Sequence, residues 1–368
     1  MICRAPATGR AEIAVPRRVN PPTTTRLVLL VVALLLALGA VFGLVLGFRT
    51  DSSSLAPRPS SPLAAAIGGA ESIQPIPLPP AGEARRIDLG RRLFSERRLS
   101  SDGTISCESC HSLDSGGADG RTVAIGVGGA LGASNTPTVW NAALNPMQFW
   151  DGRAESLEAQ IDGPLTNAVE MGSSWPRALV VLQGDAAYAR AFAEAYPEGV
   201  TPNTIKDAIA SFERTLITAG SPFDRYLEGD KNALSTSQLE GYALFKSYGC
   251  ASCHQGRNVG GNMFQKMGIM GDYFAERGGP ITTADLGRFN VTHREQDRFK
   301  FRVPSLRLAA RTAPYFHDGR VETLERAITL MGKLQLGEDI PAHDVKAISE
   351  FLECLAGPTH AELPHAAR

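Results

Sequence analysis

The pattern Cys-x-x-Cys-His occurs in this chain as CESCH at 107–111 and as CASCH at 250–254. Zinc sites also use Cys-x-x-Cys pairs, but their pairs usually lie about 15–20 residues apart, far closer than these. A thioredoxin-like site needs one such pair in a βαβ context, and this sequence does not provide that context. Two thiols one helical turn apart can instead bond to both vinyl groups of a haem, and the adjacent histidine can bind its iron. The motifs therefore predict two covalent haem c groups, attached through Cys107, Cys110, Cys250 and Cys253 and bound at iron by His111 and His254.

The rest of the chain predicts a mostly α fold with long loops. Apolar residues make up 43% of the 368 residues and charged residues 20%, as in globular proteins. Helical spacing recurs in several segments, for example at Ile205, Ile209, Phe212 and Leu216. The long loops at 112–138 and 255–322 need something to organise them, and a large buried cofactor would do so. A helix, a CxxCH motif and a turn-rich loop follow one another at 85–153 and again at 236–319, which predicts two similar domains.

The N-terminal part differs in character. Residues 27–48 are uncharged and mostly apolar, lie between Arg26 and Arg49, and are long enough to span a bilayer as a helix. The arginine-rich tail 1–26 should stay in the cytoplasm. A cleaved signal peptide is the alternative, although its apolar region is normally shorter and ends in a small-residue cleavage site. The net charge of −1 argues against nucleic acid as a partner.

Beyond the CxxCH motifs, several segments resemble the bacterial di-haem cytochrome c peroxidase family, which includes MauG-like proteins. They are NTPTVWNAALNPMQFWDGRAESLEAQIDGPLTNAVEMG (135–172), FKFRVPSLR (299–307), TAPYFHDG (312–319) and ERAITLMGKLQLG (325–337). The resemblance implies two cytochrome c-like domains around a calcium site, with one peroxidatic and one electron-accepting haem. The expected organisation is a basic tail (1–26), a membrane anchor (27–48), a Ser/Pro-rich linker (49–82), an N-terminal domain (83–220), a C-terminal domain (221–357) and a tail (358–368).

The resemblance also assigns roles to single residues. His111 resembles the proximal ligand of the peroxidatic haem, and His254 and Met331 resemble the axial pair of the other haem. Met263, Met267 and Met270 also follow CASCH, but the MGKLQLG context favours Met331 as the ligand. A thioether ligand raises the haem potential, as a haem that accepts electrons requires. Trp150 resembles the residue between the two haems.

Further residues resemble the groups around the haems. Glu170 resembles the distal acid/base of the peroxidatic site, which would move a proton between the peroxide oxygens as their bond breaks. Gln160 and Pro164 resemble its pocket companions, and His317 is expected to support the second haem or its propionates. The resemblance implies a calcium ion with oxygen ligands, as that ion prefers, from Asn135, Thr312 and Pro314.

One departure from the family pattern concerns the loop after the first haem motif. Many relatives carry a histidine there, in a sequence like SIGHG, that occupies the sixth position of the peroxidatic iron at rest. This chain reads AIGVGGALG at 124–132, with Val127 in place of that histidine. Valine cannot bind iron, so we expect a five-coordinate resting haem that needs no reductive activation.

These features together predict a membrane-anchored peroxidase facing the bacterial periplasm. It would reduce hydrogen peroxide with electrons from a small cytochrome c or cupredoxin, and relatives suggest a possible homodimer. One alternative is MauG-like oxidation of a partner protein, which Met331 disfavours because MauG has a tyrosine at that ligand position. The other is a non-enzymatic di-haem electron carrier, which would give Glu170 no role.

Overall fold

The computed structural model of this chain describes residues 71–359. The predicted anchor 27–48, the tail before it, most of the predicted linker and the segment 360–368 lie outside the described residues. Between residues 71 and 359, no helix combines the length and hydropathy that a bilayer crossing requires. The predicted transmembrane helix thus concerns a part of the chain that the structure does not describe.

The helices of the first half begin where the sequence supplies capping groups. Thr201 and Thr204 form a capping box, and Pro202 occupies the first turn of the helix that follows. Ser156, Ser174 and Asp185 cap the starts of three further helices. The helices are α3 (Ala84–Phe94), α4 (Cys107–Cys110), α5 (Leu157–Thr166), α6 (Trp175–Gln183), α7 (Ala186–Ala195) and α8 (Pro202–Glu213).

Close packing of α3 against α8 forms the centre of this half. A Cβ atom on Gly90 of α3 would lie 1.9 Å from the carbonyl oxygen of Ala208 on α8, so only glycine permits this approach. The apolar faces of the two helices enter one buried cluster that includes Leu93, Phe94 and Phe212. The helical spacing predicted around Ile205 is therefore the buried face of α8.

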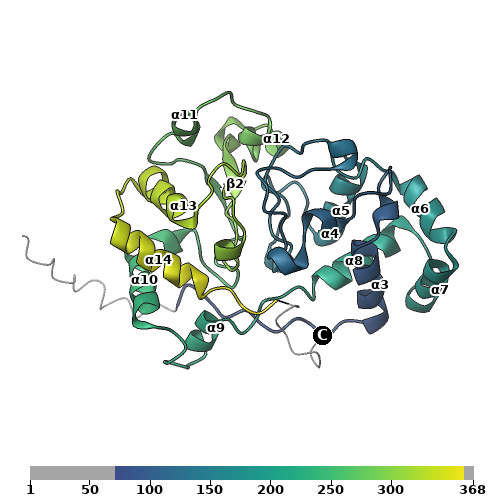
Figure 1. Cartoon of the computed structure of the whole chain (residues 1–368), viewed down its shortest axis with the longest axis horizontal. Coiled ribbons are helices and arrows are strands. Elements are labelled where there is room, and N and C mark those ends of the chain that lie inside the picture. The colour runs from purple at the N-terminus through teal and green to yellow at the C-terminus, as the bar shows by residue number, and fades with distance from the viewer. Residues whose placement is uncertain (1–70, 360–368) are drawn as a thin grey trace, which may run out of the picture. The chain divides into compact units, whose positions relative to one another are not determined.

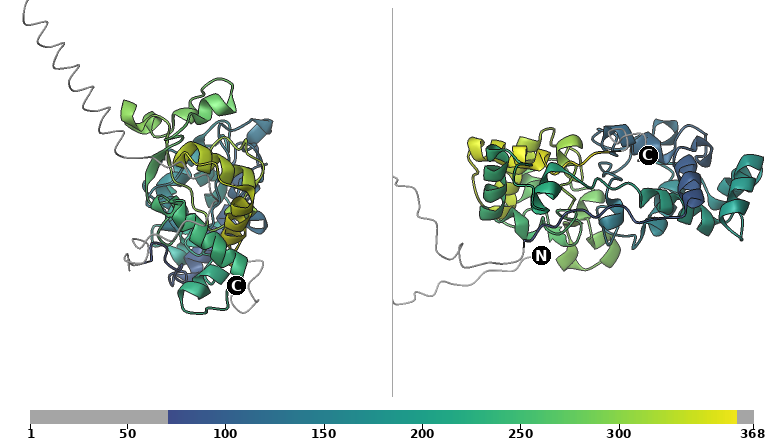
Figure 2. Two further views of the ribbon diagram at one scale, coloured as in Figure 1. Left: turned by 90° about the vertical axis from the view of Figure 1, so that its left-hand side faces the viewer. Right: turned by 90° about the horizontal axis from the view of Figure 1, so that it is seen from below.

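The second half repeats this arrangement. Its helices are α9 (Pro222–Leu227), α10 (Thr236–Ser247), α11 (Tyr273–Arg277), α12 (Phe289–Thr292), α13 (Leu324–Met331) and α14 (Ala342–Glu353). A Cβ on Gly241 of α10 would lie 1.9 Å from the carbonyl oxygen of Ala347 on α14. The helix before each CxxCH motif thus packs through a glycine against the last helix of its own half. Figures 1 and 2 show the two helix groups, α3 to α8 and α10 to α14.

Long loops connect these helices, as the sequence predicts, and β-structure is sparse among residues 71–359. Strand β1 (Phe264–Lys266) pairs antiparallel with β2 (Lys300–Arg302), and Phe264 lies opposite Arg302. The loops around this ribbon contribute a buried cluster of their own, which includes Met267, Tyr273 and Phe301. The prediction of a mostly α fold with long loops is confirmed.

Two loops with related sequences form the same turn. QFWDGRA (148–154) closes through a bridge between Gln148 and Ala154, and YFHDGRV (315–321) closes through one between Tyr315 and Val321. The second residue of each has a positive φ, 69° at Phe149 and 68° at Phe316. Trp150 and His317 therefore occupy equivalent positions in the two halves.

Candidate functional site

The first cavity, of about 360 Å³, is lined by Cys107, Cys110 and His111. Short helix α4 places both cysteines one turn apart, and His111 follows directly at its C-cap. The Nδ1 atom of His111 lies 3.1 Å from the carbonyl oxygen of Gly117, which leaves Nε2 available to a metal. Burial lowers the pKa of His111, so the ring is held in the neutral form that binds iron.

The second cavity, also about 360 Å³, repeats this pattern with Cys250, Cys253 and His254. The Nδ1 atom of His254 lies 3.3 Å from the carbonyl oxygen of Val259. Burial lowers the pKa of His254 to about 4. Met331, the last residue of α13, lines the same cavity, as does Met267.

The residues present fit two haem c groups. All four motif cysteines are free thiols, and each pair shares a cavity wall with its own histidine. Burial raises the pKa of Cys107 to about 12 and that of Cys110 and Cys250 to about 11, which keeps these thiols uncharged against an apolar guest. Each histidine presents a neutral ring whose orientation is fixed by a backbone carbonyl. Haem bound at either site would supply a redox-active iron.

Glu170, Gln160 and Pro164 line the first cavity. Helix α5 supplies Gln160 and Pro164, and the turn after it supplies Glu170. Asn167 donates a hydrogen bond of 2.6 Å from Nδ2 to Oε1 of Glu170, which orients the carboxylate. The cavity therefore combines an acid/base group with the first CxxCH motif.

The loop 124–132 closes over the same region without a metal-binding side chain. Gly126 donates its amide to Ala130, Gly132 donates to Ala124, and Val127 donates to the carbonyl oxygen of Glu170 at 2.8 Å. The residues of the loop that line the cavity are Ala124, Gly126 and Gly132. The loop therefore contributes no iron ligand to this cavity. Met171 also lines it, but belongs to the buried apolar cluster of the first half.

Trp150 lies at the boundary of the two cavities and lines both. Its indole Nε1 donates a 2.9 Å hydrogen bond to the carbonyl oxygen of Asn135. Its ring meets the ring of His317 edge to face, with centroids 6.5 Å apart. The two residues that occupy equivalent turns thus meet between the two cavities.

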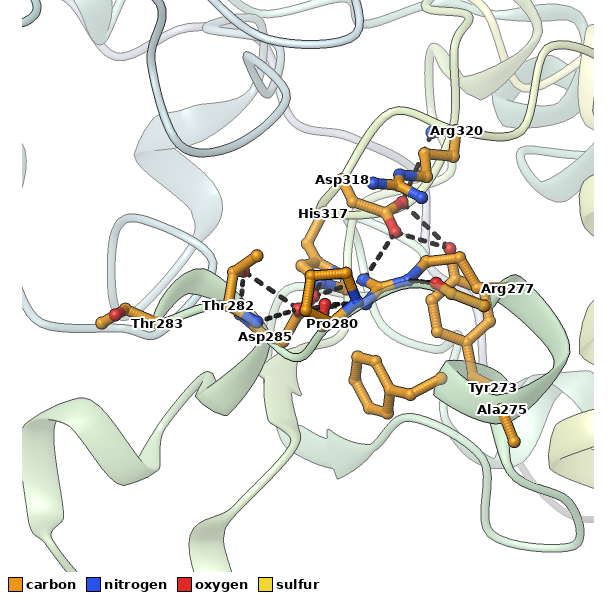
Figure 3. A network of polar contacts seen from close by, with 12 residues as sticks. Tyr273, Ala275, Arg277, Pro280, Thr282, Thr283, Asp285, His317, Asp318 and Arg320 are labelled. Carbon is orange, nitrogen blue, oxygen red and sulfur yellow. Dashed lines mark hydrogen bonds and ion pairs between the residues drawn. The ribbon is translucent and has the colours of Figure 1, made fainter.

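His317 is held by a buried network of charged side chains (Figure 3). Its Nε2 lies 2.8 Å from Asp285, and its ring stacks on Phe301 at 4.2 Å. Arg277 bridges Asp285 and Asp318, at 2.6 and 3.2 Å. Burial acts to raise the pKa of Asp285, but the hydrogen bonds, led by that of Arg277, outweigh it and hold this pKa well below its usual range. Asp285, His317 and Asp318 lie close enough to hold a metal ion, but both carboxylates already pair with the guanidinium of Arg277.

The residues expected to bind calcium lie together at the second cavity. Asn135, Thr312 and Pro314 all line it. The amide nitrogen of the Asn135 side chain donates to the carbonyl oxygen of Arg121 at 2.8 Å, which leaves its Oδ1 as an acceptor. The hydroxyl of Thr312 donates a 3.2 Å hydrogen bond to the carbonyl oxygen of Leu308.

Sequence reasoning missed two charged residues on the cavity walls. Glu213 ends α8, lines the first cavity and is 6% exposed. Glu213 follows Ile205 and Ile209 at the same four-residue spacing, on the buried face of α8. An acidic residue on an apolar helix face could therefore have pointed to it from the sequence. Arg302 lines both cavities and is 5% exposed. When the two halves are aligned so that Pro137 matches Pro304, Arg302 takes the position of Asn135. That alignment would have drawn attention to Arg302.

Burial, reinforced by repulsion from Glu158, raises the pKa of Glu213 to about 8 from an ordinary value of 4.5. Between pH 4.5 and 8 the unfolded chain loses this proton while the folded chain keeps it, so stability falls as pH rises. Glu213→Gln should therefore gain stability over the native protein between pH 5 and pH 8, by up to a few kcal/mol. Denaturant unfolding of both holoproteins at the two pH values measures this gain.

The exposed Glu198→Gln provides the control, and its unfolding free energy relative to the native protein should not depend on pH in this way. An equal stability difference between Glu213→Gln and the native protein at pH 5 and pH 8 would contradict the prediction.

Comparison with known proteins places this geometry in a family. Residues 84–232 match the family model described as di-haem cytochrome c peroxidase. Cytochrome c peroxidase Ccp of Escherichia coli is 48% identical over 288 residues, covering 78% of this chain and 61% of that protein. Cytochrome c551 peroxidase of Nitrosomonas europaea is 46% identical, covering 78% of this chain and 84% of that protein.

Among solved structures, a MauG-like protein associated with microbial copper homeostasis superposes with a TM-score of 0.68 at 30% identity, covering 79% of this chain and 95% of that one. The resemblance predicted from the sequence motifs is confirmed, and membership of the family implies two haem c groups. The peroxidase relatives, at 48% and 46%, are more identical to this chain than methylamine utilization protein MauG of Methylorubrum extorquens, at 35% over 66% of this chain, which favours peroxidase over MauG-like chemistry. The chain belongs to the di-haem cytochrome c peroxidase family, whose named members among these relatives are oxidoreductases acting on peroxide.

Proposed function

We propose that this chain reduces hydrogen peroxide to water at the first cavity. The observation that carries the proposal is that Glu170 and Gln160 line the same cavity as the CxxCH histidine His111, beside a loop without an iron ligand. A haem held by His111 supplies an iron that binds peroxide and exchanges electrons with it. Each turnover consumes one peroxide, two electrons and two protons, and yields two waters.

Glu170 serves as the proton carrier in this proposal. Its carboxylate takes the proton from one peroxide oxygen and returns it to the other, which leaves as water. The Asn167 hydrogen bond fixes one carboxylate oxygen and leaves the other free for this transfer. Gln160 lies one α5 turn before Pro164 and lines the same cavity as Glu170, where its amide could hold peroxide in place.

Electrons would arrive through the second cavity. His254 and Met331 line this cavity and would hold the haem iron there, and a methionine ligand suits a haem that accepts electrons from a donor. Trp150 lines both cavities and offers an aromatic connection between them. The donor proposed is a small cytochrome c or a cupredoxin.

A calcium ion near the second cavity is a further part of the proposal. Asn135 can offer its Oδ1, and Thr312 and Pro314 their carbonyl oxygens, which are hard ligands of the kind calcium prefers. These three oxygens accept no hydrogen bond from another residue between 71 and 359. Loss of activity in a calcium chelator, with recovery on adding calcium, would support this ion.

The proposed location is the periplasmic face of the bacterial inner membrane, with 27–48 as the anchor or, alternatively, as a cleaved signal. A homodimer, which the family resemblance of the sequence implies, is a further part of the proposal. Membrane fractionation of the full-length chain, with N-terminal sequencing of the mature protein, separates an anchor from a signal.

Steady-state peroxide consumption with a reduced cytochrome c donor tests the function. Rapid turnover is expected. Slow turnover, with peroxide-dependent oxidation of a partner protein, would favour the MauG-like alternative, which the structural likeness to a MauG-like protein supports. No turnover in a protein that carries both haems would favour a simple electron carrier and overturn the proposal.

The oxidised protein should contain a five-coordinate haem in the first cavity before any reduction. Among the residues of the loop 124–132 that line the cavity, none carries an iron-binding side chain, so we expect a high-spin ferric signal by electron paramagnetic resonance. Val127→His is the informative variant, because it restores the histidine that the family resemblance expects in this loop. Val127 itself does not line the cavity, so the loop must move to bring that histidine to the iron. The variant should add a low-spin signal and make peroxide turnover depend on prior reduction.

The prediction fails if the native oxidised protein gives only low-spin signals. Another side chain would then occupy the iron, and Met171 is the one methionine among the described residues that line this cavity.

A further inference from the structure

Arg302 lies where the two cavities meet. It ends strand β2, opposite Phe264, and its backbone amide donates a 2.8 Å hydrogen bond to the carbonyl oxygen of Trp150. Its side chain lines both cavities, yet the residue is only 5% exposed. The strand pairing and the link to Trp150 therefore fix a guanidinium beside both haem sites.

No carboxylate between residues 71 and 359 pairs with this guanidinium. The protein acceptor recorded for it is the carbonyl oxygen of Phe149, 3.3 Å from Nε. Burial lowers the pKa of Arg302 to about 10, so it remains charged at neutral pH. Two other deeply buried arginines differ, because Arg307 pairs with Asp224 at 2.7 Å and Arg277 pairs with Asp285 at 2.6 Å.

The charges on the cavity walls sharpen this contrast. In the described part of the chain, the residues lining the second cavity include no aspartate or glutamate, and Arg302 is their only lysine or arginine. The first cavity is also lined by Arg153, but that residue pairs with Asp151 at 3.1 Å. Arg302 is thus the one unpaired guanidinium that both cavities share among the described residues.

An unpaired buried charge is costly, and the usual remedy is a bound counter-ion with matching hydrogen-bond geometry. The terminal nitrogens of a guanidinium form a fork that fits a carboxylate. A haem carries two propionate carboxylates, so a haem in either cavity brings the missing anion. We propose that Arg302 is a carboxylate receptor shared by both haems, binding a propionate of each and raising the reduction potential of both.

This proposal rests on the two haem sites and not on peroxidase activity. A fixed positive charge favours the reduced haem, which carries one positive charge fewer than the oxidised haem. A charge shared by both sites must therefore act on both potentials, whereas a charge belonging to one site acts on that site alone.

The test is a spectroelectrochemical titration of both haems in the full-length holoprotein, at fixed calcium. Arg302→Gln should lower the equilibrium constant for reduction of each haem about tenfold or more. For a one-electron couple, this lowers each reduction potential by about 59 mV or more. Arg302→Lys keeps the charge but loses the fork, so it should shift both potentials in the same direction by less. Arg153→Gln is the matched control, because it lines the first cavity alone, and it should leave the second haem unchanged.

Haem content, measured optically, must remain at two per chain for the comparison to hold. A shift at one haem only, or at neither, would overturn the shared receptor. If Arg302→Gln does not assemble with both haems, the potentials of Arg302→Lys test the proposal instead. Smaller shifts at both haems would support it, and unchanged potentials would contradict it. Absence of peroxide turnover in the native holoprotein, with both shifts present in Arg302→Gln, would instead count against the proposed function alone.

Discussion

Replacing Glu170 by glutamine should lower kcat for hydrogen peroxide by about 10²- to 10⁴-fold, the range typical of a lost general acid/base. Glutamine has the same shape and can still accept the hydrogen bond from Asn167, but it cannot take up a proton at the peroxide. Steady-state turnover with a reduced cytochrome donor measures the loss. Optical spectra of both haems should be unchanged, which separates a catalytic defect from a structural one.

The control for this variant is Glu155→Gln, an exposed glutamate just before α5. It should turn over at the native rate. Native turnover in Glu170→Gln would show that another group moves the proton. Besides Glu170, the acids lining the first cavity in the described part of the chain are Asp151, already paired with Arg153, and Glu213. Glu213→Gln would then be the variant to assay next.

Local patterns predicted much of this molecule. A CxxCH motif sets its own geometry, because the two cysteines and the histidine share one turn of helix, and the structure accordingly places each triplet on one cavity wall. Helical spacing around Ile209 likewise anticipated the buried face of α8. The turns of Trp150 and His317 share their sequence as well as their shape.

What the sequence could not predict depends on contacts between distant segments. Nothing local to FKFRVPSLR distinguishes Arg302, which is buried without a carboxylate, from Arg307, which is buried with Asp224. The difference arises from what each side chain meets across the fold. The burial of Glu213 is similar, because an acid at the end of a helix is usually exposed, and only packing of α8 against the cavity removes it from water.

The packing of each helix pair leads to the second large prediction. Gly241→Ala should destabilise the holoprotein by a net of about 1–2 kcal/mol and weaken retention of the second haem. The added Cβ would lie 1.9 Å from the carbonyl oxygen of Ala347 and 2.9 Å from Cβ of Phe351, so α10 and α14 must separate. Such overpacking typically costs about 1–3 kcal/mol and occasionally more, which outweighs the gain of about 1 kcal/mol from replacing glycine in a helix.

Denaturant unfolding of the holoprotein, followed by circular dichroism and by haem absorbance, measures both effects. Glu240→Ala is the matched control, because it adds a good helix former at an exposed position of α10 beside the contact, and it should be neutral or slightly stabilising. Gly90→Ala should destabilise the first half in the same way, because its Cβ would lie 1.9 Å from the carbonyl oxygen of Ala208. If Gly241→Ala instead unfolds like Glu240→Ala, the two helices can separate at little cost, and the close contact is not what holds α10 and its haem motif in place.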